Sequence, residues 1–93
     1  MLVSPSPGIT IVNRTPTFTW TSTADASSFT IQVSVEKSFE RPMLSEEVDE
    51  NSYTIAGGKL THDKTYYWRV KANSGSKSTA WSEINTFKTI FLG

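Results

Sequence analysis

The residue types that could carry catalysis in this chain are one histidine, its neighbouring aspartate and many serines. His62 precedes Asp63, and serines occur throughout the sequence. Together these are the parts of a nucleophile, a general base and an orienting acid. No serine lies in the glycine-flanked spacing that exposes a nucleophile on a tight turn, and a His–Asp pair is ordinary composition for a solvated turn. We therefore expect no catalytic residue and no enzyme activity.

Four carboxylates lie close together in the middle of the chain: Glu46, Glu47, Asp49 and Glu50. Carboxylate oxygens are the ligands that calcium prefers, but the spacing lacks the alternating Asp or Asn and the glycine of a calcium loop. A charged edge strand that blocks pairing with another sheet explains the cluster as well. The pair Gly57-Gly58 is a turn and not a phosphate-binding loop. The sequence thus predicts neither a metal site nor a cofactor.

Two aromatic side chains are the best candidates for contact with a ligand. Successive side chains of an extended strand point to opposite faces. Tyr67 therefore points away from the face shared by Tyr66 and Trp68 and lies on the same face as Arg69. Trp81 follows a polar stretch. An exposed ring of this kind can stack on a sugar or on an aromatic side chain of a partner. It can equally be a surface residue that stabilises its cross-strand neighbours, so Tyr67 and Trp81 are weak ligand-contact candidates.

These side chains must be positioned by strands, because the hydrophobic pattern of the chain has a period of two. The clearest case is the segment 65–72, where large apolar residues alternate with Arg69 and Lys71. Similar runs recur about every 8–12 residues between turn formers, which is typical of a sandwich or barrel. The predicted strands cover residues 2–12, 17–21, 29–35, 43–48, 52–55, 65–72 and 84–89. Ile84 and Phe87 differ in parity, which requires a bulge or a later start of the last strand.

Composition limits the class of protein and of partner. The 93 residues form one domain, and nine basic residues balance nine acidic ones, so we expect no nucleic-acid partner. No apolar run reaches the roughly 18 residues of a membrane span. The chain has no cysteine, so its three Trp, three Tyr and five Phe must stabilise the core in place of disulfides. Without a signal-peptide pattern, the protein is either cytosolic or a domain cut from a longer chain, and we favour the second.

These residues resemble a fibronectin type III domain over nearly the full length of the chain. Trp20 is similar to the tryptophan of the second strand of that family, and the spacing from Leu60 to Tyr66 is similar to its tyrosine corner. Tyr66, Trp68 and Val70 are similar to its sixth strand. The resemblance implies an all-β fold, a seven-stranded antiparallel β-sandwich with fibronectin type III or immunoglobulin-like topology. The expected core is Phe18, Trp20, Phe29, Ile31, Val33, Leu60, Tyr66, Trp68, Val70 and Phe87.

The resemblance also implies two local contacts. The hydroxyl of Tyr66 should reach a backbone group in the preceding loop, near Leu60 to Asp63. Trp81-Ser82 resembles half of the tryptophan–serine box of cytokine-receptor domains, with Ser78 where the first tryptophan would stand. In that arrangement Trp81 would stack on Arg69 or Lys71 as a structural ladder.

The resemblance implies a non-catalytic role, because two sheets packed about 10 Å apart leave no deep pocket. We expect a structural spacer or protein-interaction module from a larger secreted or cell-surface protein, monomeric, with neighbouring domains of the same chain as partners. The alternative is a carbohydrate-binding accessory module that binds polysaccharide through Tyr67 and Trp81. The domain spans residues 1–93 with a core of roughly 9–90, and Phe91 and Leu92, within 91–93, would form a linker or an interdomain contact.

Overall fold

The computed structural model describes residues 2–4, 8–11, 15–21, 26–57, 59–61 and 63–90. These residues form strands and connections, and none of them belongs to a helix long and apolar enough to cross a membrane. The strands are β1 (Leu2–Ser4), β2 (Ile9–Ile11), β3 (Thr17–Trp20), β4 (Ser28–Ser34), β5 (Leu44–Val48), β6 (Ser52–Thr54), β7 (Thr65–Ser74), β8 (Lys77–Ser78) and β9 (Asn85–Thr89).

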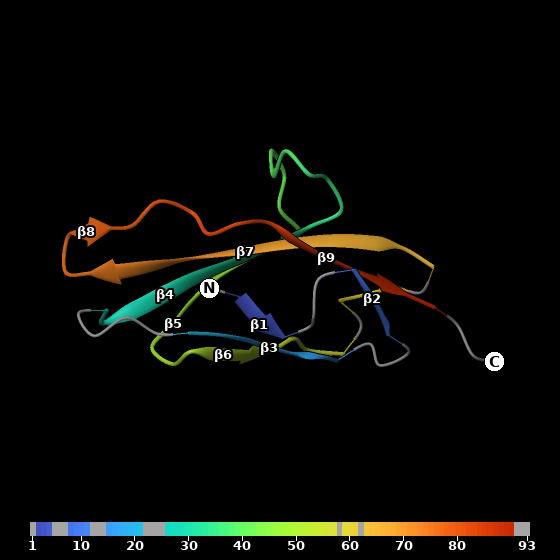
Figure 1. Ribbon diagram of the computed structural model, residues 1–93, viewed down its shortest axis with the longest axis horizontal. Coiled ribbons are helices and arrows are strands. Elements are labelled where there is room, and N and C mark those ends of the chain that lie inside the picture. Colours follow the sequence, from blue (N-terminus) through green and yellow to red (C-terminus); the bar gives the residue numbers. More distant parts are fainter. Residues whose placement is uncertain are drawn as a thin grey trace.

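The strands form two sheets that lie over one another (Figure 1). The smaller sheet has the order β1-β3-β6, and the larger has the order β2-β9-β7-β4-β5, with the short β8 paired to the end of β7. The pairs are antiparallel except β2 with β9, which run parallel. The predicted β-sandwich class is therefore confirmed, but the expectation of a purely antiparallel sandwich is wrong at one edge.

The predicted count of seven strands is also wrong, since the described residues contain nine. The segment 2–12, expected as one run, contributes β1 to one sheet and β2 to the other. Pro5 and Pro7 stand between them in the sequence, and proline cannot donate the hydrogen bonds of a continuous ladder. The second strand that the prediction lacked is β8, which precedes β9 in the sequence. It pairs with the C-terminal end of β7, whereas β9 pairs with the N-terminal end.

The period-two pattern sorts side chains to the two faces as predicted. All ten predicted core residues are buried, and Leu2, Leu44 and Ile55 join them in one hydrophobic cluster. The predicted strand 29–35 is one residue too long: β4 ends at Ser34, and Val35 is 47% exposed. Ile84 lies before β9, which starts at Asn85. The late start of this strand resolves the parity conflict between Ile84 and Phe87.

Aromatic rings connect the two sheets through the core. Phe18 from the smaller sheet lies 4.9 Å from Trp68 and 5.6 Å from Phe87, measured between ring centroids. Trp20, from the same strand as Phe18, lies 6.5 Å from Trp68. Within the larger sheet, Tyr66 stacks on its register partner Phe87 at 5.4 Å. Tilted and offset contacts of this kind each contribute about 0.5–1.5 kcal/mol beyond the burial of area. They hold the sandwich together in a chain without cysteine.

The Tyr66 hydroxyl forms hydrogen bonds with the backbone of the connection that precedes β7. Thr61 N–H donates to the Tyr66 hydroxyl at 2.8 Å, and that hydroxyl donates to the Thr61 carbonyl oxygen at 3.4 Å. The partner is thus within the stretch from Leu60 to Asp63 that the sequence indicated. Leu60 is buried beside it, in the same core cluster as Tyr66.

We predict that Tyr66→Phe lowers the free energy of unfolding by about 1 kcal/mol or more, because it leaves the Thr61 N–H without its acceptor. Urea denaturation followed by tryptophan fluorescence measures this loss. A variant with unchanged stability would contradict the role given to this hydroxyl. Tyr67→Phe, which alters a hydroxyl on the opposite face of the same strand, is the matched control.

Candidate functional site

The outer face of β7 carries a stack of cationic and aromatic side chains. The guanidinium carbon of Arg69 lies 4.1 Å from the ring centroid of Trp81 and 4.3 Å from that of Phe39. The Lys71 ammonium lies 4.8 Å from the Trp81 ring centroid. Contacts between a cation and an aromatic face contribute about 0.5–2 kcal/mol each. Trp81 therefore contacts both cations that the sequence proposed as alternatives.

A side-chain amide fixes the plane of the Arg69 guanidinium. Nε and Nη2 of Arg69 donate to Gln32 Oε1 at 3.1 and 2.8 Å. Gln32 lies opposite Arg69 in the register of β4 and β7, and its own Nε2 donates to Ser45 Oγ on β5 at 3.4 Å. Burial lowers the pKa of Arg69 from its ordinary value, since removal from water disfavours a charge.

Phe39 is the member of this stack that the sequence analysis missed. It lies between β4 and β5, outside any alternating run, and it is nevertheless buried. Its φ of 58° is in the left-handed region, which is unfavourable for a bulky residue. Its N–H donates to the Glu36 carbonyl at 3.2 Å in a local turn. A phenylalanine within a polar, charged loop was the available signal that this loop packs against something.

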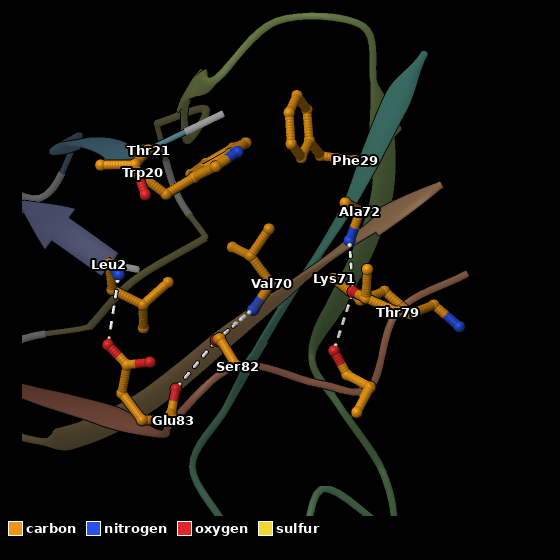
Figure 2. Close-up of a pocket in the computed structure, with 11 residues that line it drawn as sticks. Leu2, Trp20, Thr21, Phe29, Val70, Lys71, Ala72, Thr79, Ser82 and Glu83 are labelled. Atoms are coloured by element: carbon orange, nitrogen blue, oxygen red, sulfur yellow. Dashed lines mark hydrogen bonds between the residues drawn. The ribbon is translucent and has the colours of Figure 1, made fainter. Parts of the chain in front are cut away.

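The segment between β8 and β9 presents Trp81 to β7 through two hydroxyl bridges. Val70 N–H donates to Ser82 Oγ, and Ala72 N–H donates to Thr79 Oγ1, both at 3.0 Å (Figure 2). In return the N–H groups of Ser82 and Thr79 donate to the carbonyls of Val70 and Ala72 at 2.8 and 2.9 Å. These bonds replace a regular ladder where neither β8 nor β9 pairs with β7.

A groove of about 220 Å³ runs along the inner side of this segment. Apolar groups of Leu2, Trp20 and Val70 line it together with Glu83 (Figure 2). The carboxylate of Glu83 accepts the Leu2 N–H at 3.2 Å and so connects β1 to the segment between β8 and β9. Hydrogen bonds from its own backbone N–H and from Leu2 lower the pKa of Glu83. Because the lining is mostly apolar and Glu83 is engaged, we assign this groove no chemistry.

The other residues considered from the sequence do not come together as a site. Glu46 and Glu47 lie on the edge strand β5, where Glu47 accepts the Ser28 hydroxyl at 2.7 Å. Among the described residues no group of three or more His, Cys, Asp or Glu side chains is arranged to hold a metal ion. Asp63 is exposed in a turn with a φ of 58°. His62, Phe91 and Leu92 lie outside the described residues.

The two ligand-contact candidates share one face of the sandwich. Tyr67 is half-buried on the outer face of β7, in register with Ser34 on β4 and Thr86 on β9. Trp81 is also half-buried, with its ring over Arg69 and Lys71. The structure thus gives Trp81 the contacts of the structural ladder and still leaves part of its ring accessible.

A family model for the Rha78A-like, N-terminal immunoglobulin domain matches residues 6–93. The chain belongs to this family. The match includes every strand after β1, and with it the outer-face stack and the segment that carries Trp81. A search of curated protein sequences found no match.

Two solved structures have a fold similar to that of this chain. An alpha-L-rhamnosidase from Dictyoglumus thermophilum superposes with a TM-score of 0.73 and 19% identity over 92% of this chain. This chain spans only 11% of the length of that rhamnosidase chain. An Fn3-like protein from Clostridium thermocellum has a TM-score of 0.67 and 18% identity, covering 95% of this chain and 92% of that one. Both likenesses concern the fold.

We predict that Trp81→Ala lowers the free energy of unfolding by about 1–2 kcal/mol, because it removes the aromatic face from Arg69 and Lys71. Chemical denaturation at low and high salt measures the loss. Arg69→Ala in the Trp81→Ala background should then cost less than Arg69→Ala alone. Strictly additive effects of the two substitutions would contradict the stacking contact.

Proposed function

We propose that the chain is a non-catalytic module of a longer, rhamnosidase-related protein, in which it holds neighbouring domains at a fixed distance. The observation that carries this proposal is the family match over residues 6–93, because the family is described as an N-terminal domain. An N-terminal domain is followed by further chain, which in this proposal carries the catalytic activity. The partners of the module are then the neighbouring domains themselves.

The packing of the sandwich supports a mechanical role over a chemical one. The space between the sheets is filled by side chains such as Phe18, Trp68 and Phe87, none of which is more than 1% exposed. A substrate needs a concave site with convergent polar groups, and the aromatic core occupies the place where one would form. In this proposal the module works through its rigidity, with its loops and strand edges available for contact.

We propose that the module is monomeric and belongs to a secreted or cell-surface protein, and the composition of its surface supports the monomeric state. The large exposed hydrophobic residues in the described part of the chain are Val3, Ile9, Val35 and Ile84. The edge strand β5 carries Glu46 and Glu47, and carboxylates on an edge discourage pairing with a second sheet. We propose the extracellular location because rigid modules of this fold commonly space the domains of secreted enzymes.

The full-length gene product tests this proposal, in comparison with the 93-residue chain. We expect the full-length product to hydrolyse p-nitrophenyl α-L-rhamnopyranoside and the 93-residue chain to release no p-nitrophenol above the buffer rate. Deletion of the module should lower the melting temperature of the remaining protein and leave its KM for this substrate nearly unchanged. Activity in the 93-residue chain, or a gene product that ends at Gly93, would contradict the proposal.

A further inference from the structure

The two cations on the outer face of β7 have no carboxylate partner among the residues that the structure describes. Arg69 contacts Phe39, Trp81 and Gln32, and Lys71 contacts Trp81. Neither side chain forms an ion pair within the part of the chain that the structure describes. Arg69 is half-buried, so part of its hydration is lost without an opposite charge in return. An anion brought to this place would compensate that cost.

The geometry of the stack prepares Arg69 to receive a planar anion. The rings of Phe39 and Trp81 cover the guanidinium, and Gln32 Oε1 occupies its Nε and Nη2 donors. A guanidinium has five N–H donors, and the others have no acceptor among the described residues. Donors that lie in the guanidinium plane suit a carboxylate, which accepts two parallel hydrogen bonds. An anion would thus approach in the plane of the guanidinium.

The strand residues around this place carry charges of one sign, whereas the loop that carries Phe39 adds both signs with the exposed Glu36, Lys37, Glu40 and Arg41. The outward residues of β7 and β9 are Thr65, Tyr67, Arg69, Lys71, Asn73, Thr86 and Lys88, by the alternation and register of the two strands. None of them is acidic. In the strand register the nearest acid is Glu47 on β5, which is aligned with Lys71 through Thr30 on the intervening strand β4. Its carboxylate already accepts the Ser28 hydroxyl.

We propose that this face binds a uronic-acid polysaccharide, with a sugar carboxylate held by Arg69 and Lys71 and the accessible part of Trp81 beside the sugar ring. The hydroxyls of Thr65 and Thr86 lie on the same outward face as the cations and can bond to the hydroxyls of a sugar chain. An acidic protein surface fits less well, because the fully buried core of a protein interface is more apolar than the rest of the surface. The four large exposed apolar residues of the described chain lie outside β7 and β9.

This binding does not depend on the position of the module in a longer protein, and it can be tested on the 93-residue chain. The probe is oligogalacturonate in isothermal titration calorimetry at low salt. We expect saturable binding that weakens as salt is added, and no binding of a neutral galactan of similar length. Lys71→Gln should weaken binding several-fold, and so should Arg69→Lys, which keeps the charge but loses the planar fork.

The matched control is Lys59→Gln, which removes one exposed charge from the connection before β7, away from the stack. It should bind oligogalacturonate as the unaltered chain does. Thermal unfolding of each variant verifies that it is folded. Absence of binding, equal weakening by Lys59→Gln and Lys71→Gln, or equal binding of galactan would overturn the proposal. Equally tight binding of poly-L-glutamate would overturn it in favour of a site for any carboxylate polymer.

Discussion

The constraint on which the rest of the structure depends is the contact between aromatic rings of opposite sheets. Phe18 on β3 lies against Trp68 on β7 and Phe87 on β9, and no disulfide is present to do the same work. The two sheets can close only if every strand sends its apolar side chains to one side. The strict alternation along β4 and β7 follows from that requirement, and it leaves the other side of each strand free for polar contacts.

The two faces of β7 consequently serve different purposes. Tyr66 and Trp68 face inward and hold the sheets and the preceding loop, whereas Arg69 and Lys71 face outward. On the edge of β7 away from β4, between its pairings with β9 and β8, the backbone is bonded by the hydroxyls of Thr79 and Ser82. This irregular segment brings Trp81 over the cations, so a break in the ladder creates the stack on the outer face of β7.

The sequence predicts the parts of this structure that depend on local alternation. Side-chain parity identified the buried faces of β4 and β7, because parity is set within one strand. The corner hydrogen bond of Tyr66 was predicted from the resemblance to fibronectin type III domains, which the spacing of Leu60 and Tyr66 carries. Phe39 was missed, since its burial depends on a loop conformation with positive φ and on a ring contact with a distant strand. The division of the first strand was missed for a similar reason: the choice of sheet for β1 and β2 is made by their partners.

The measurement that most directly tests the central claim is the stability of Phe18→Leu, which keeps an apolar side chain but removes both aromatic contacts across the core. Urea denaturation should show a loss of about 1–3 kcal/mol, the combined contribution of two ring pairs, with an unchanged dependence on urea concentration. A loss below about 0.5 kcal/mol, less than one such ring pair contributes, would contradict the claim that these rings hold the two sheets together.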